Sequence, residues 1–224
     1  MIVGGLSFDG IIFDLDGTLI DSGGIWQSVD EKFFSERKLK MPPDYPSAIA
    51  HLGFEKAAVY TKKRFHLEEA PEEIVREWEN EVVDLYRNEL LLKDGAEDFL
   101  RLAEKSGCAL GIATAAQKNC YEPCLKRNGI AAFFSDIVDT TRYPSGKRSP
   151  EIYLDIAGKW GLSPSRVLVI EDILTALQSA RAGGFLTCAI YEKTCKDEKE
   201  KRRIGDLYIE SFRDLMKEAK EIQR

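Results

Sequence analysis

Histidine is scarce in this sequence of 224 residues, which contains only His51 and His66. We therefore expect neither histidine-based catalysis nor a metal site built from several imidazoles. Cysteine is also sparse, and the number of cysteines is odd. Their positions, 108, 120, 124, 188 and 195, match no zinc-site spacing. We interpret all five as reduced thiols without a catalytic role, and Cys108 and Cys188 as small buried apolar residues.

Long apolar runs and an excess of basic residues are absent as well. No stretch approaches the length of a membrane-spanning helix, and no basic segment followed by an apolar one stands near the N-terminus. The formal net charge of -6 argues against nucleic acid or an anionic membrane as the main partner. We expect a cytoplasmic protein in which an anionic substrate needs a cation and specific Lys or Arg residues.

The composition is typical of an ordinary globular protein, with 44% hydrophobic and 31% charged residues. Residues 23–92 carry apolar side chains at steps of three and four, as helices do. Elsewhere helical patterns alternate with strand-like runs near residues 11–13, 108–114, 133–138, 166–172, 185–191 and 207–209. We predict a core domain of residues 1–22 and 93–224, in which helices cover both faces of a Rossmann-like parallel sheet, and an inserted helical domain of residues 23–92.

Three of the predicted strands end in polar residues, after Phe13, Ala113 and Ile170. Because the carboxyl ends of parallel strands lie at one edge of a sheet, residues far apart in sequence meet there. The first strand is followed by Asp14 and Asp16. A bare Asp-x-Asp pair is usually a solvated turn. Two carboxylates at the end of a buried strand, however, need a metal ion, a ligand or a hydrogen-bond network to offset the cost of burial.

The longer string around this pair, Gly10-Ile-Ile-Phe-Asp-Leu-Asp-Gly-Thr-Leu-Ile-Asp-Ser22, resembles the first motif of the haloacid dehalogenase (HAD) superfamily of phosphotransferases. The resemblance implies that Asp14 is a nucleophile that accepts a phosphoryl group. It also implies that Asp16 is the general acid/base and that its backbone carbonyl is a metal ligand. Since the nucleophile and the phosphate are both anionic, a divalent cation has to offset their repulsion, and Mg²⁺ suits oxygen ligands.

The run Gly111-Ile-Ala-Thr114 resembles the second HAD motif, a hydrophobic strand that ends in Thr or Ser. The resemblance implies that Thr114 is a catalytic and phosphate-binding residue, together with the backbone of Ala115 at a helix N-terminus. Many relatives carry Asn or Ser where this chain has Ala115 and Ala116. The alternative for Thr114 is a plain helix N-cap.

The segment Ser145-Gly-Lys-Arg-Ser-Pro-Glu-Ile-Tyr153 resembles the third HAD motif, although Arg148 replaces the usual Pro. A single Lys in a polar loop is usually solvated surface. The resemblance instead implies that Lys147 binds phosphate and stabilises both the nucleophile and the charge on the transferred group.

The strand end Val169-Ile-Glu-Asp172 resembles the fourth HAD motif, whose acids hold Mg²⁺ directly or through water. Two successive acids after so apolar a strand cannot both be buried without a partner. Relatives commonly have Ser and Gly where this chain has Ile173 and Ala176. The metal ligands implied by the four motifs are Asp14, Asp16, Glu171 and Asp172.

An insertion between the first and second motifs corresponds to the type 1 cap of the β-phosphoglucomutase/phosphoglycolate phosphatase-like HAD group. The resemblance implies a Mg²⁺-dependent phosphatase that hydrolyses a small phosphorylated metabolite, a phosphate monoester, through an aspartyl-phosphate on Asp14. A sugar phosphomutase is the main alternative. A phosphonatase-like enzyme would need a cap lysine, for which Lys56, Lys62 and Lys63 are available, and a non-catalytic binding protein is disfavoured by the intact motifs.

Three other segments carry predictions. Residues 51–56 stand where relatives place a substrate-specificity loop. Residues 192–203 are a run of charges that we interpret as solvated surface. We assign the aromatic residues of the inserted domain to packing between its helices rather than to the cleft; they are Trp26, Phe33, Phe34 and Trp78. Phosphoglycolate, a hexose phosphate and a nucleotide are all compatible substrates, and the oligomeric state does not follow from the sequence.

Overall fold

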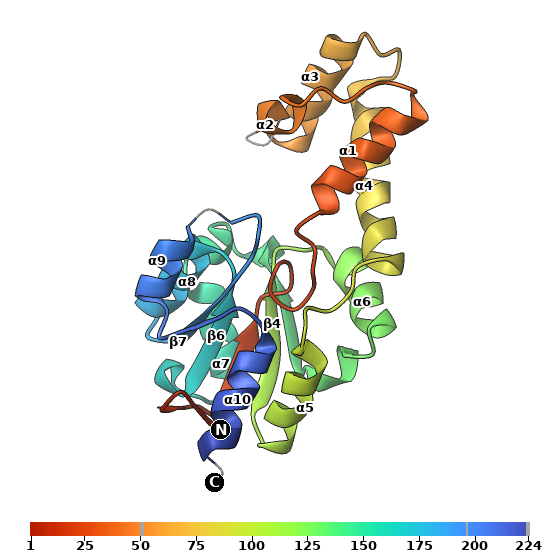
Figure 1. The fold of residues 1–224 in the computed structure, drawn as a ribbon. Coiled ribbons are helices and arrows are strands. Elements are labelled where there is room, and N and C mark those ends of the chain that lie inside the picture. The colour runs from red at the N-terminus through yellow and green to blue at the C-terminus, as the bar shows by residue number, and fades with distance from the viewer. Residues whose placement is uncertain (50–51, 196, 223–224) are drawn as a thin grey trace. The chain divides into compact units, whose positions relative to one another are not determined.

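The computed structural model describes residues 1–49, 52–195 and 197–222, and its α/β part is built on a sheet of six parallel strands (Figure 1). In spatial order the strands are β5-β4-β3-β6-β7-β8. Their bounds are β3 Gly10–Phe13, β4 Ala109–Thr114, β5 Asp136–Asp139, β6 Val167–Glu171, β7 Leu186–Ile190 and β8 Leu207–Ile209. A separate hairpin of β1 Ile2–Val3 and β2 Leu6–Ser7 precedes the sheet.

The helices divide between two compact units, residues 1–23 with 90–224 and residues 24–89. The second unit contains α1 Ile25–Glu36, α2 Tyr45–Ile49, α3 Phe54–Phe65 and α4 Pro71–Asn88. The first contains α5 Ala96–Lys105, α6 Lys118–Arg127, α7 Glu151–Lys159, α8 Leu174–Ala182, α9 Glu198–Ile204 and α10 Phe212–Ile222. Within the described ranges, no helix is both long and apolar enough to cross a membrane.

Strand β3 lies between β4 and β6 and is buried along its whole length. Phe13 pairs with Ile112 of β4 and with Ile170 of β6. The next two strands in sequence, β4 and β5, extend the sheet on one side, and β6 to β8 extend it on the other. The carboxyl end of β3 is therefore a topological switch point, where open α/β sheets bind their ligands. The register places Asp14 level with Glu171.

Successive side chains of β3 point to opposite faces of the sheet, and helices bury both. Ile12 belongs to a core cluster with Ile156 of α7 and Ala180 of α8. On the other face, the ring of Phe13 contacts Phe99 of α5 and Phe212 of α10, with centroids 6.3 and 6.2 Å apart. Burial on both faces explains why the strand is continuously apolar. The predicted fold class is confirmed.

The helical unit has an aromatic core of its own. Phe33 and Phe34 of α1 are buried, and the ring of Phe33 lies 5.5 Å from that of Trp78 on α4. The packing interpretation holds for these residues. It holds only in part for Trp26, which is 53% exposed. Trp26 stands in the first turn of α1, and its ring contacts the partly exposed Phe54 at the start of α3.

The interpretation of residues 192–203 as solvated surface is wrong at two positions. Lys201 on α9 is completely buried, and Glu192 is only 3% exposed. Both side chains are buried because they have partners elsewhere in the fold. Lys201 donates to two backbone carbonyls, and Glu192 forms an ion pair with Lys93 at 2.7 Å. Burial of a charge is tolerated where such partners exist.

Two further predicted segments differ in their bounds from the elements of the structure. The strand expected at residues 133–138 begins later, at Asp136, because residues 131–133 form a 3₁₀ turn. The proposed substrate loop of residues 51–56 begins at His51, which lies outside the described residues, and from Phe54 onward it is the first turn of α3.

Candidate active site

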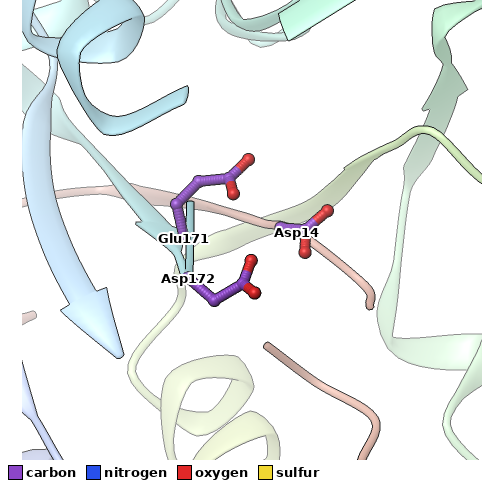
Figure 2. A group of neighbouring side chains, drawn as sticks. All are labelled: Asp14, Glu171 and Asp172. Carbon is purple, nitrogen blue, oxygen red and sulfur yellow. The ribbon is translucent and has the colours of Figure 1, made fainter. Parts of the chain in front are cut away.

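Three buried carboxylates meet at the carboxyl ends of two neighbouring strands. Asp14 follows β3, Glu171 is the last residue of β6, and Asp172 comes directly after it. They are 4%, 0% and 5% exposed, respectively, and one oxygen from each lies within 4.8 Å of the others. Figure 2 shows the three side chains set around a common space. The strand register brings them together, because Phe13 and Ile170 are paired.

A buried lysine supplies positive charge to this cluster. Lys147 lies in a 3₁₀ turn, Gly146–Arg148, and its ammonium contacts Asp14 Oδ1 and donates to Glu171 Oε1 at 2.8 Å. Burial favours the neutral amine, but the two carboxylates outweigh it and hold the pKa of Lys147 above its usual value. The hydroxyl of Tyr153 on α7 donates to the same Glu171 oxygen at 2.8 Å.

One ammonium does not compensate three carboxyl groups. Burial raises the pKa of Glu171 to about 8 and that of Asp172 to about 7, and the charge of Asp14 adds to both shifts. Within the described residues, Glu171 Oε2 and Asp172 Oδ1 are buried without a hydrogen-bond partner. A buried anionic oxygen without a partner is costly. A group of carboxylate oxygens whose negative charge one ammonium only partly offsets fits a hard divalent cation such as Mg²⁺.

The turn after β3 requires glycine at position 17. The Leu15 carbonyl accepts hydrogen bonds from the amides of Leu19 and Ile20, which closes a single tight turn. Gly17 has φ of +74°, a conformation that other residues adopt at a cost. A Cβ at Gly17 would also lie 2.5 Å from Asp172 Oδ2. The glycine therefore serves both the turn and the close approach to the carboxylate cluster.

Asp16 is half-buried in the same turn, and its carboxylate is not part of the three-carboxylate group. Burial raises the pKa of the Cys120 thiol near the start of α6, and the charge of Asp16 adds to that shift. A role of Asp16 as metal ligand rests on its backbone carbonyl alone.

Thr114 ends β4, directly beside β3, and is fully buried. Its hydroxyl oxygen accepts a hydrogen bond from the amide of Ala116 at 2.9 Å. This contact is of the capping kind that the sequence left as the alternative, although helix α6 begins only at Lys118. Ala115, between the two, is exposed. The hydroxyl proton of Thr114 is not used in this bond, so the group can still donate to a ligand.

The model of one protein family, the haloacid dehalogenase-like hydrolases, matches residues 11–190, which is most of the chain and includes every residue of the cluster. The chain belongs to this family. The match confirms the predicted family and the prediction of an enzyme.

Several known proteins resemble this HAD-like hydrolase over nearly its whole length. An N-acetylmuramic acid 6-phosphate phosphatase of Pseudomonas aeruginosa is 28% identical, and the match covers 92% of each chain. A phosphoglycolate phosphatase of Salmonella paratyphi A is 26% identical and covers 92% of this chain and 90% of its own. A solved structure of a β-phosphoglucomutase candidate from Thermotoga maritima covers 96% of this chain and 100% of its own, with a TM-score of 0.85 and 18% identity. At 18% identity, the similarity to this solved structure shows a shared fold and nothing further.

Three residues that contact the cluster of this HAD-like hydrolase were not among the predicted site residues, and Tyr153, whose hydroxyl donates to Glu171, is one of them. Lys201 donates to the backbone carbonyl of Asp172, and the thiol of Cys195 lies 3.7 Å from Asp172 Oδ2. Neither Lys201 nor Cys195 carried a sequence signal, because Lys201 stands in a charge run and the cysteines have no ligand spacing. All five cysteines are free, as predicted, and Cys108 and Cys188 are buried.

Proposed function

We propose that the protein is a Mg²⁺-dependent phosphatase that hydrolyses a small phosphate monoester, with Asp14 as nucleophile and Asp16 as general acid/base. The observation that carries the proposal is the pair of contacts made by Lys147, whose ammonium bridges Asp14 and Glu171. A carboxylate nucleophile beside a fixed cation, with buried carboxyl oxygens left without partners next to it, suits attack on an anionic phosphate.

The reaction would proceed in two displacements. A carboxylate oxygen of Asp14 attacks phosphorus, the ester P–O bond breaks, and Asp16 gives a proton to the leaving oxygen. Asp16 then takes a proton from water, whose oxygen attacks phosphorus and breaks the bond to Asp14. Lys147 pairs with Asp14 and offsets charge on the transferred group, while Thr114 and the Ala115 amide bind phosphate oxygens.

The residues that would hold Mg²⁺ are Asp14, Glu171 and Asp172, together with the backbone carbonyl of Asp16. When bound, the ion would neutralise part of the repulsion between the phosphate and the nucleophile. The support for this site is the grouping of the three carboxylates and their unpartnered oxygens.

We assign residues 1–22 and 93–224 to the catalytic core and residues 23–92 to a cap that closes the site and excludes bulk water. As substrate class we propose small phosphorylated metabolites of the sugar phosphate or phosphoglycolate kind. Two relatives in sequence support this class, since one is named as a phosphatase of N-acetylmuramic acid 6-phosphate and the other of phosphoglycolate.

The contacts of Lys62 in the helical unit argue against the phosphonatase alternative. A phosphonatase needs a free amine to form an imine, but Lys62 donates to the carbonyls of three residues after the end of α3, at 2.9, 3.0 and 2.7 Å; they are Leu67, Glu68 and Glu69. This ammonium has all three of its donors engaged. Lys62 is therefore a structural residue at the end of α3.

The experiment that tests the proposed activity measures phosphate release from a panel of phosphorylated metabolites, with Mg²⁺ and with EDTA. We expect turnover of at least one sugar phosphate or phosphoglycolate that requires the metal. A sugar phosphate that isomerises once a bisphosphate is added, without phosphate release, would establish the phosphomutase instead. Metal-independent turnover would contradict the proposed site.

A further inference from the structure

We propose that Lys201 is a positioning residue, which holds Asp172 in place for the metal ion from the distant helix α9. The inference rests on the proposed function, because it concerns a ligand of the proposed Mg²⁺ site. It adds a residue that lies outside all four motifs and touches the site only through the backbone.

Lys201 is a buried ammonium with two hydrogen bonds and one ion pair. It donates to the carbonyl of Asp172 at 2.9 Å and to the carbonyl of Ile190 at 3.1 Å, and it forms an ion pair with Glu198 at 2.6 Å. Ile190 ends β7, and Asp172 follows the end of β6. The side chain therefore ties together the carboxyl ends of two neighbouring strands, at the edge where the cluster lies.

Asp172 has little else to hold it. Among the described residues, Asp172 Oδ1 has no hydrogen-bond partner, and Oδ2 accepts a weak hydrogen bond from the Cys195 thiol at 3.7 Å. Ile173, the next residue, has no donor on its side chain and is half exposed. The direction of the carboxylate is thus set mainly by its own backbone, and Lys201 is the side chain that fixes this backbone.

The cost of burying a lysine supports a specific role. Lys201 is 0% exposed, and an apolar side chain could fill such a position without the loss of hydration that an ammonium suffers. A charged segment whose only role is solvation would not need a buried and paired lysine. It also places a positive charge near Asp172, where it works against the burial that raises the pKa of this carboxyl.

The test measures Mn²⁺ binding by electron paramagnetic resonance, without substrate, in the wild type, Lys201→Met and Lys199→Met. Lys199 lies on the same helix and is exposed, so its substitution removes the same charge without touching either carbonyl. We expect the Kd for Mn²⁺ to rise about tenfold or more in Lys201→Met, the usual cost of losing an outer support of a metal ligand. In Lys199→Met it should stay within about twofold of the wild type.

Two further variants complete the test. Lys201→Arg keeps donors for both carbonyls and should recover most of the lost affinity, which a loss of packing alone would not explain. If the Lys201→Met protein does not fold, Lys201→Gln is measured instead. The glutamine side chain keeps a polar group in the same space, but it is too short to reach both carbonyls.

Two failures are distinguishable. A folded Lys201→Met or Lys201→Gln protein that binds Mn²⁺ as tightly as the wild type would overturn the inference, provided that Asp172→Asn has lost this binding. If Asp172→Asn also binds Mn²⁺ normally, the proposed metal site itself is wrong, and the role of Lys201 falls with it.

Discussion

At the scale of single residues, Glu171 shows how a buried carboxylate is divided between the protein and a ligand. Its Oε1 accepts hydrogen bonds from Tyr153 and Lys147, both at 2.8 Å. Its Oε2 is buried without a partner in the part of the chain that the structure describes. One oxygen is thus fixed by the protein, and the other is available to a cation.

Replacing Tyr153 by phenylalanine tests how firmly this oxygen is fixed. Tyr153→Phe removes one buried hydrogen bond to Glu171, so we expect the free energy of unfolding to fall by about 0.5–1.5 kcal/mol. Tyr143→Phe is the matched control, because its hydroxyl bonds to Asp155 at 3.0 Å where water can replace it. Urea unfolding of the metal-free proteins gives the comparison. An equal loss of unfolding free energy in the two variants would show that the buried bond to Glu171 stabilises the protein no more than an exposed one.

The sequence was informative for residues that lie in contiguous strings and uninformative for residues that act across the fold. The acids after β3 and β6 stand in motifs, and the structure brings Asp14, Glu171 and Asp172 together. Lys201 acts through carbonyls that are far away in the sequence, and no local pattern marks it. A backbone acceptor is present at every residue, so its partner is found only in three dimensions.

At the scale of elements, the turn of residues 14–20 decides whether the site is assembled. It carries Asp14 and Asp16, and its tight closure depends on the positive φ of Gly17. The space beside Gly17 is taken by the carboxylate of Asp172. The turn and the end of β6 therefore fit each other only with glycine at this position.

Gly17→Ala and Gly107→Ala together separate backbone strain from this close approach. Both glycines have φ of +74°, but a Cβ at Gly107 meets nothing within 4 Å. We expect both variants to lose about 1–2 kcal/mol of stability from the strained backbone. Only Gly17→Ala should lower kcat/KM, by about 100-fold, because it displaces Asp172. Equal activity in the two variants would show that the close approach is unimportant.

Elements were predictable where periodicity is strong. The six strands of the sheet lie where the apolar runs placed them, apart from the late start of β5. Strands that are buried on both faces are recognised by their continuous apolar composition. Helix α9 was missed because its residues are almost all charged, and composition alone favours a solvated segment. Trp26 packs on Phe54 but is more exposed than expected, because helical periodicity does not show where a helix face ends.

At the scale of the whole molecule, the helical unit of residues 24–89 carries an electrostatic cost of its own. Asp30 on α1 is 7% exposed, and burial raises its pKa from 3.8 to about 6. The folded protein therefore binds this proton more tightly than the unfolded chain does. Stability is lost as the pH rises from about 4 to about 6, and the cost above pH 6 reaches about 3 kcal/mol.

Asp30→Asn should remove this cost without changing the size of the side chain. We expect the variant to be more stable than the wild type by up to about 3 kcal/mol near pH 7.5 and by almost nothing near pH 4. Glu36→Gln on the same helix is exposed and should show no such trend. Thermal unfolding across this pH range is the measurement. A constant difference between Asp30→Asn and the wild type would rule out titration of Asp30 as the cause.

The most direct measurement concerns Asp14 itself. The enzyme is mixed with a substrate found in the metabolite panel, quenched in acid within one turnover, digested and analysed by mass spectrometry. We expect the mass of a phosphoryl group on the peptide that contains Asp14, and neither the label nor turnover in Asp14→Asn. Turnover that proceeds while Asp14 stays unlabelled, or that survives Asp14→Asn, would contradict the nucleophilic role on which the proposed function depends.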